Sequence, residues 1–171
     1  MNLSEQLDFR YPHRGPVRQA LLGLASTAPM SRLLARTQRP ADRAVLRMSG
    51  GRTTATALLA GLPVLWVTTS GAKSGSPRTV PLLAIPHAES LALIGTHYGT
   101  KHTPGWVYNL IANPAAQAGW KGKEVAVTAR RLTEAEQAPV WEAASAIYGG
   151  YGHYRQRASH RKIEVFLLET A

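Results

Sequence analysis

The stretch Thr-Thr-Ser-Gly-Ala-Lys-Ser-Gly-Ser-Pro-Arg-Thr, at residues 68–79, decides the fold of this chain. An apolar run at residues 64–67 leads into the stretch, and a second run at residues 80–85 follows it. Apolar runs on both sides of a Gly- and Ser-rich segment are typical of two strands joined by a turn. The sequence therefore predicts a hairpin here.

The predicted turn also has the chemistry of an anion site. Gly71 and Gly75 can adopt positive φ, which would let main-chain N–H groups converge on a guest. Lys73 and Arg78 add positive charge, and Ser70, Ser74 and Thr79 add hydroxyls. This set suits a phosphorylated or polycarboxylated ligand. An ordinary hairpin turn with solvated charges explains the same residues.

The remaining patterns extend the hairpin into a mainly β fold. Six strands are predicted, at residues 64–69, 80–86, 90–96, 115–120, 123–131 and 162–169. Helices are expected at residues 103–112 and 133–147, and residues 148–154 are predicted to form a mobile loop of Gly and Tyr. Because five of the strands follow one another through short links, an antiparallel barrel is favoured over a parallel sheet with alternating helices.

Charge separates the chain into two parts. The 171 residues have a formal net charge of +10, a composition that favours anionic partners, and they contain no Cys, which excludes disulfides and thiolate chemistry. Residues 1–38 are predicted to form a basic, partly helical N-terminal extension outside the core, and residues 39–171 the barrel domain. For the Arg-rich start, a solvated surface, contact with anionic lipid and contact with nucleic acid all remain open.

Beyond the hairpin, the chain resembles the deazaflavin-dependent nitroreductase family, whose members are small split β-barrel proteins that bind coenzyme F420. The resemblance covers about residues 43–171. It rests on residues 65–82, on Pro104-Gly-Trp106 with Asn109-Leu110 and Ala112-Asn113-Pro114, on the tyrosines at 148, 151 and 154, and on the last strand. The combination is specific, although each piece alone is a weak signal.

The resemblance implies a six-stranded split β-barrel (α+β) with flanking helices and an F420 site. The residues expected to bind the cofactor are Gly71, Lys73, Ser74, Gly75, Arg78, Thr79, Pro81, Thr96, His97, Lys101, Trp106 and Asn109. Tyr98, Tyr148 and Tyr154 are expected to line the substrate space. Tyr151 is the expected hydrogen-bond or proton donor, with Thr96 on the opposite wall. A packed aromatic face explains the tyrosine spacing equally well.

The chain departs from the family pattern in two places. Tyr98 stands where a small residue is usual, and two glycines lie between Tyr148 and Tyr151, where more restrictive residues are common. Both departures bear on the substrate more than on the cofactor.

We therefore expect a cytoplasmic F420-dependent oxidoreductase that delivers hydride to an apolar, electron-poor acceptor such as a quinone, an enone or a nitroaromatic. It is expected to act as a monomer or homodimer, with peripheral contact to anionic membrane through its N-terminus, and without a metal or nucleic acid. The alternatives are an FMN-binding split barrel and a non-catalytic F420 carrier.

Overall fold

A computed structural model describes residues 2–10, 40–42, 44–45, 47–49, 62 and 64–171. Its centre is a seven-stranded antiparallel sheet with the strand order β2-β1-β5-β6-β7-β4-β3. The strands are β1 (Val64–Ser70), β2 (Pro77–Leu83), β3 (Ile85–His87), β4 (Ser90–Ile94), β5 (Ala115–Trp120), β6 (Lys123–Arg131) and β7 (Val165–Thr170). The fold is thus mainly β with some helices, as expected.

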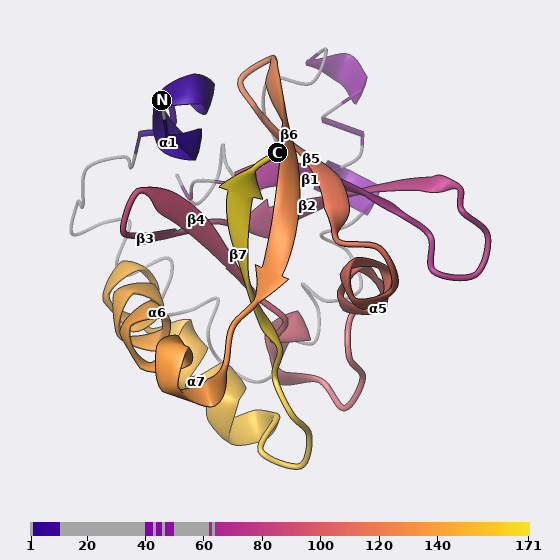
Figure 1. Cartoon of the computed structure of the whole chain (residues 1–171). Helices are drawn as coiled ribbons and strands as arrows, with labels where there is room; N and C mark the ends of the chain where they lie inside the picture. Colours follow the sequence, from indigo (N-terminus) through magenta and orange to yellow (C-terminus); the bar gives the residue numbers. More distant parts are fainter. Residues whose placement is uncertain (1, 11–39, 43, 46, 50–61, 63) are drawn as a thin grey trace.

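The two edge strands of the sheet are consecutive in the chain. β2 and β3 lie at opposite ends of the strand order, yet only the buried Ala84 separates them. The chain therefore runs directly from one edge of the sheet to the other, which requires the sheet to curl into a half-barrel (Figure 1). The prediction of one strand at residues 80–86 was wrong for this reason, and with it the count of six strands.

The hairpin at residues 64–83 forms as predicted. Thr68 pairs with Thr79 and Ser70 with Pro77, which leaves residues 71–76 as the connecting turn. Pro77 and Pro81 lie on β2, an edge strand, where a missing N–H costs the sheet little. β1 is the inner strand of the hairpin and is almost entirely buried, because β5 pairs with its other side.

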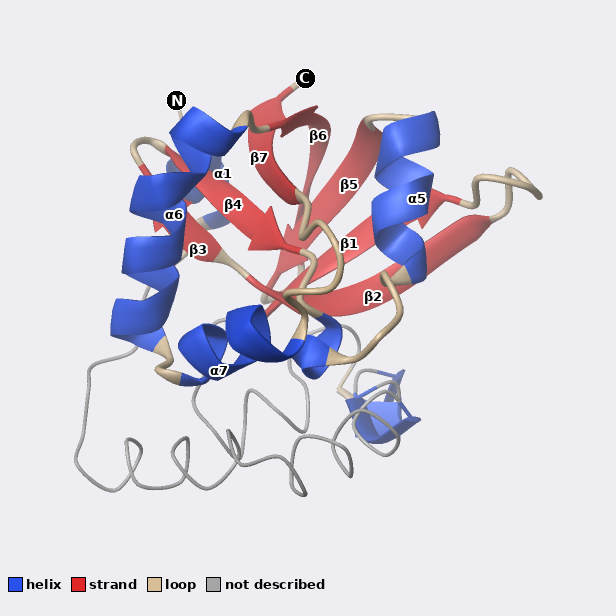
Figure 2. Ribbon diagram, turned by 90° about the horizontal axis from the view of Figure 1, so that it is seen from below, coloured by secondary structure: helices blue, strands red, loops and turns tan. Residues whose placement is uncertain are grey.

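Two apolar clusters hold the sheet. The first contains Leu65, Val67 and Phe166 together with the helix α5 (Gly105–Ala112). The second contains Val64, Ile85 and Val165 together with α6 (Glu134–Ile147) and α7 (Gly150–Arg157). Figure 2 shows α6 and α7 on one side of the curled sheet and α5 on the other. Consecutive residues of β1 enter different clusters because strand side chains alternate between faces.

The N-terminal residues belong to the barrel core. Helix α1 (Leu3–Leu7) begins with a capping box between Asn2 and Glu5, and Leu3, Leu7 and Phe9 are buried in the first cluster. The prediction that residues 1–38 form an extension outside the core was therefore wrong for residues 3–9. Residues 11–38, which make up most of the predicted basic N-terminal extension, lie outside the described residues.

The predicted helices at residues 103–112 and 133–147 are present as α5 and α6. Helix α6 begins with a capping box, in which Glu136 accepts hydrogen bonds from the N–H and hydroxyl of Thr133. The predicted loop at residues 148–154 was wrong, because α7 occupies most of this segment. No helix in the described part of the chain is long and apolar enough to cross a membrane.

Candidate functional site

The turn of the β1–β2 hairpin is a compact loop closed by its own hydrogen bonds. Gly71 N–H donates to the carbonyl of Ser76 at 2.9 Å, and Gly75 N–H donates to the carbonyl of Gly71 at 2.8 Å. Gly75 has a φ of +66°, which favours glycine, whereas Gly71 is needed for space, since a Cβ there would lie 2.8 Å from Ser74 Oγ.

Asn109 attaches this turn to helix α5. Its amide nitrogen donates to Thr69 Oγ1 at 2.9 Å, and its amide oxygen accepts from the N–H of Ala72 at 2.9 Å. Thr69 is almost fully buried, so the Asn109 amide joins a buried position on β1 to the exposed turn. The predicted cofactor residue Asn109 thus holds the turn in place.

Four N–H groups of the turn are used within the protein, whereas its two cations are exposed. The N–H groups of Gly71, Ala72, Gly75 and Ser76 all have partners within the protein. Lys73 and Arg78, by contrast, have exposed side chains and form no ion pair within residues 64–171. Their charge is available to an anion.

The other predicted hairpin residues lie close to these cations. Ser74 is exposed in the turn, and Thr79 is exposed on β2. Thr79 Oγ1 lies 2.8 Å from Thr68 Oγ1, which fixes its hydroxyl across the hairpin. Pro81 is half-buried two residues further along the edge strand.

A second group of predicted residues lies on the loop after β4. Residues His97–Gly99 form a short 3-10 turn in which φ is +46° at His97, +56° at Tyr98 and +73° at Gly99. Left-handed backbone is costly for residues with a Cβ, so external contacts must hold this loop. Thr96, at its start, is buried, and Lys101, after its end, is exposed.

Arg161 provides three such contacts. Its Nη2 donates to the carbonyls of Gly95 at 3.1 Å and Thr96 at 2.7 Å, and its Nε donates to the carbonyl of Thr100 at 3.3 Å. Sequence patterns assign no role to Arg161, so this role was missed. Nothing in the spacing around Arg161 signals a guanidinium that binds main-chain carbonyls.

The same loop packs closely against α7. A Cβ at Gly99 would lie 2.9 Å from Arg157 Cβ and 3.2 Å from Tyr154 Cα, so only glycine fits. The ring centroids of Tyr98 and Tyr154 are 6.0 Å apart. His97 Nδ1 lies 2.7 Å from Thr100 Oγ1, an interaction within the loop itself.

The predicted tyrosines gather in the second apolar cluster. Tyr148, Tyr151 and Tyr154 are all buried, and the Tyr148 and Tyr154 hydroxyls lie 2.9 Å apart. Tyr151 packs edge-on against Trp141. Burial raises the pKa of the Tyr151 phenol, so its hydroxyl stays protonated. The structure thus places Tyr151 in a packed helix, and no exposed mobile loop carries it.

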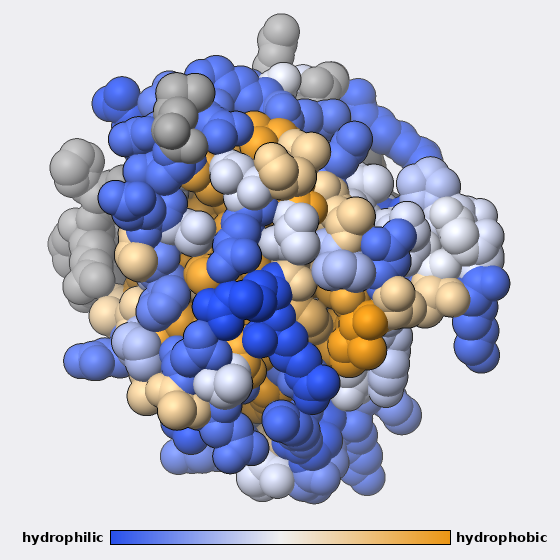
Figure 3. All heavy atoms as spheres, viewed as in Figure 1, coloured by the Kyte–Doolittle hydropathy of each residue, from blue (hydrophilic) through white to orange (hydrophobic). Residues whose placement is uncertain are grey.

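Helix α5 lies between the hairpin and the second group. Val107 packs on Gly95, where a Cβ would lie 2.9 Å from Val107 Cγ2, and Asn109 contacts the hairpin two residues later. Trp106, predicted to contact the cofactor, is buried in the core beside Phe166. The predicted cofactor residues therefore form two groups, one on the β1–β2 hairpin and one on the loop after β4, and α5 contacts both. Trp106, on α5 itself, is buried in the core. Figure 3 shows that hydrophilic residues cover most of the face seen in Figure 1.

Within the described residues, no group of three or more His, Asp or Glu side chains is arranged to hold a metal ion. His97 and His102 meet through a ring nitrogen and a main-chain carbonyl, at 3.2 Å. This contact belongs to the loop itself and does not form a ligand pair.

Comparisons with known proteins identify relatives over most of the barrel. The family model described as F420H(2)-dependent quinone reductase matches residues 37–170. An F420H(2)-dependent quinone reductase of Mycobacterium tuberculosis is 30% identical over 109 residues, which cover 62% of this chain and 72% of the relative.

Solved structures give the same result. An F420-H2 dependent reductase is 33% identical with a TM-score of 0.57, covering 63% of this chain and 94% of that chain. A protein described as a domain-swapped dimer is also 33% identical with a TM-score of 0.57, covering 63% of this chain and 80% of its own. The half-barrel described above is consistent with the split-barrel fold of these relatives.

Proposed function

The chain belongs to the F420H(2)-dependent quinone reductase family, and from this premise we propose that it passes hydride from reduced F420 to an acceptor of the quinone class. It is an oxidoreductase, and its cofactor is F420. When bound, reduced F420 supplies the hydride, and the protein has to bind, orient and shield the reactants.

The observation that carries the proposal is the pair of exposed cations on the hairpin. F420 bears a phosphodiester and an oligoglutamate tail, so its binding site must accept several negative charges. Lys73 and Arg78 meet this need, because both are exposed and no carboxylate pairs with them among residues 64–171. The amide of Asn109 fixes the turn that presents them.

The other cofactor residues have supporting roles in this proposal. Thr96, His97 and Lys101 contact the cofactor from the loop after β4, with Ser74, Thr79 and Pro81 on the hairpin side. Trp106, a residue of α5, has an indirect role, because its buried ring anchors the helix in the core. Tyr98 and Tyr154, whose rings are in contact, border the acceptor space together with Tyr148.

The Lys73→Ala/Arg78→Ala double variant tests the cofactor site. Loss of both charge-assisted contacts should weaken F420 binding by about 2–4 kcal/mol, roughly 30- to 1000-fold in Kd. Quenching of the fluorescence of the four tryptophans follows the titration. The control is Lys121→Ala/Lys123→Ala, which removes two cations from the β5–β6 hairpin. Equal weakening in both double variants would show that overall charge, rather than this turn, attracts F420.

Tyr151 is proposed to donate a hydrogen bond to the acceptor oxygen as hydride arrives. Its raised phenol pKa keeps the donor proton in place at neutral pH. Because Tyr151 is buried against α6, this role requires α7 to move when the acceptor binds.

The Tyr151→Phe variant removes only the hydroxyl. The single-turnover oxidation of reduced F420 by a quinone should slow by roughly 10- to 1000-fold, while F420 affinity stays near that of the wild type. A wild-type rate with several acceptors would assign Tyr151 to packing alone and move the donor role to Thr96, Tyr98 or Tyr154.

Turnover and the absorbance spectrum of the purified protein separate the two alternatives. A non-catalytic carrier would bind F420 without oxidising its reduced form in the presence of any acceptor, and a flavoprotein would be purified with the absorbance spectrum of FMN. Peripheral contact of the basic N-terminal extension with anionic membrane, a monomeric or homodimeric state and a cytoplasmic location stay predictions.

A further inference from the structure

Arg161 lies in the segment between α7 and β7, outside every predicted site. Its guanidinium nevertheless contacts the main chain on both sides of the His97–Gly99 turn. Nη2 donates to the carbonyls of Gly95 and Thr96, and Nε donates to the carbonyl of Thr100. One planar group thus holds both ends of the turn.

The turn needs this support because its backbone is unfavourable. His97 and Tyr98 have φ values of +46° and +56°, and each such residue costs on the order of 1 kcal/mol or more relative to ordinary backbone. Turns of this kind persist where surrounding contacts over-determine them. Further contacts include the Glu164 carbonyl, which accepts the Gly95 N–H at 2.9 Å, and the packing of Gly99 on α7.

The charge of Arg161 remains uncompensated within the described part of the chain. Its hydrogen-bond acceptors there are all neutral carbonyls, and no ion pair to a carboxylate includes it. Partial burial removes part of the hydration of the guanidinium, and this lowers the pKa of Arg161. An arginine retains its charge under such conditions.

These contacts point to a role in binding as well as in folding. Thr96 and His97 are cofactor residues in the function proposed above, and the Arg161 guanidinium binds the carbonyl of one of them directly. We propose that Arg161 is a positioning residue for the F420 site. Its fork of donors fixes residues 95–100 in the conformation that binds the cofactor, and the inference rests on the proposed function.

The fork geometry gives a sharp test. Arg161→Lys retains the positive charge but replaces a planar fork with a single ammonium, which cannot hold three carbonyls in fixed directions. Arg161→Gln removes the charge as well. We expect both variants to bind F420 about 10- to 100-fold more weakly than the wild type in a fluorescence titration.

A second measurement does not depend on the cofactor. Hydrogen exchange of the amides at residues 95–101 in the cofactor-free protein should be faster in Arg161→Lys than in the wild type, because the turn opens more often. The matched control is Arg155→Gln. Arg155 lies on α7 with its guanidinium over the Trp141 ring, so the variant removes one charge nearby but no contact to the turn. Its F420 affinity and its exchange at residues 95–101 should match those of the wild type.

Three results would overturn the inference. If Arg161→Lys bound F420 within about twofold of the wild type, fork geometry would be unimportant for binding. If Arg155→Gln weakened binding as much, the effect would be one of general charge. If the wild type itself bound no F420, the proposed function would fail, and the positioning role with it. Only the first two results leave the proposed function intact.

Discussion

At the scale of single residues, the Asn109 amide connects three parts of the molecule. It joins α5 to a buried hydroxyl on β1 and to the exposed turn that carries Lys73. Asn109→Ala leaves the Thr69 hydroxyl without this donor and the Ala72 N–H without its acceptor. We expect a loss of about 1–2 kcal/mol in the free energy of unfolding, and about tenfold weaker F420 binding because the turn is less ordered.

Asn113→Ala is the control for this prediction. Asn113 follows the same helix, and its side chain accepts a hydrogen bond from the N–H of Ala115 at 3.0 Å. Its removal should reduce stability without affecting the turn. Chemical denaturation and F420 titration of both variants give the comparison. If the two variants bound F420 equally well, Asn109 would contribute to stability only.

The sequence predicted some of the residues discussed here but not others. Lys73 and Arg78 were predicted because cations beside glycines in a turn are visible in the sequence, and Asn109 because it belongs to a motif that carries the family resemblance. Arg161 was missed because its acceptors are main-chain carbonyls 61 to 66 positions away. Every residue has a carbonyl, so no residue type in the sequence identifies such a partner.

At the scale of secondary structure, α7 is the element that differs most from prediction. Three glycines in the stretch of residues 149–152 indicate a flexible loop, yet α7 begins at Gly150. The cause is tertiary: the Tyr148 ring lies directly over Gly150, where a Cβ would clash with it. Aromatic packing in the second cluster thus outweighs the low helix propensity of glycine.

This packing predicts opposite effects for two neighbouring glycines. Gly150→Ala forces the Tyr148 ring to move and should destabilise the protein by about 1–3 kcal/mol. Gly152→Ala should stabilise it by about 0.5–1 kcal/mol, because a Cβ there meets nothing within 4 Å and alanine favours a helix. Thermal unfolding of the two variants measures both effects. Equal and stabilising effects would mean that Tyr148 does not cover Gly150.

Other elements were predicted where local pattern and tertiary context agree. The β1–β2 hairpin, α5 and α6 have strong turn or capping signals, and they form at the predicted places. α1 was not predicted, because it has only five residues and its stability comes from burying Leu3 and Leu7. The break at Ala84 was also missed, since it reflects closure of the sheet.

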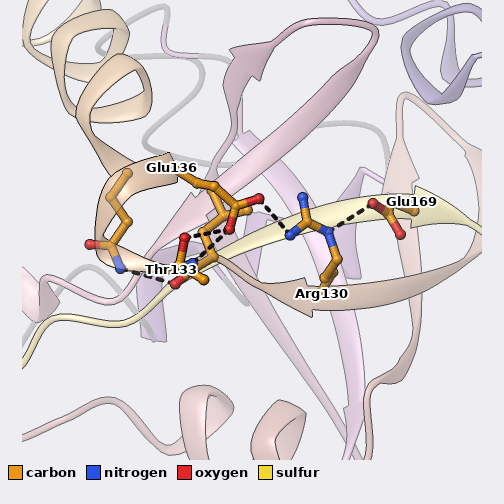
Figure 4. Close-up of polar contacts among 6 residues, drawn as sticks. Arg130, Thr133, Glu136 and Glu169 are labelled. Atoms are coloured by element: carbon orange, nitrogen blue, oxygen red, sulfur yellow. Dashed lines mark hydrogen bonds and ion pairs between the residues drawn. The ribbon is translucent and has the colours of Figure 1, made fainter.

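At the scale of the whole molecule, the curled sheet has to keep its two clusters together. The inner strand β6 is central to this, because its Arg130 reaches both β7 and α6 (Figure 4). Arg130 donates to Glu136 at 2.8 Å and to Glu169 at 3.1 Å. This network joins the sheet to the helix that covers the second cluster.

The network predicts a specific sensitivity to acid. Hydrogen bonds from the Thr133 N–H, from Arg130 and from the Thr133 hydroxyl lower the pKa of Glu136 from 4.5 to about 2. A carboxylate whose pKa is lower in the folded state contributes stability above its unfolded pKa. That contribution is lost as the pH falls from about 4.5 towards about 2. Because Glu136 is exposed, solvent reduces the size of the effect.

Glu136→Gln should remove this part of the acid response. We expect the melting temperature of the variant to fall less steeply than that of the wild type between about pH 4.5 and pH 2. Glu134→Gln is the control, since Glu134 is in the same first turn but, among the described residues, forms only an exposed ion pair of 3.7 Å with Lys162. Its pH profile should parallel that of the wild type. Parallel profiles for both variants would mean that the Arg130–Glu136 contact does not couple folding to pH, and that acid unfolds the barrel through its other carboxylates.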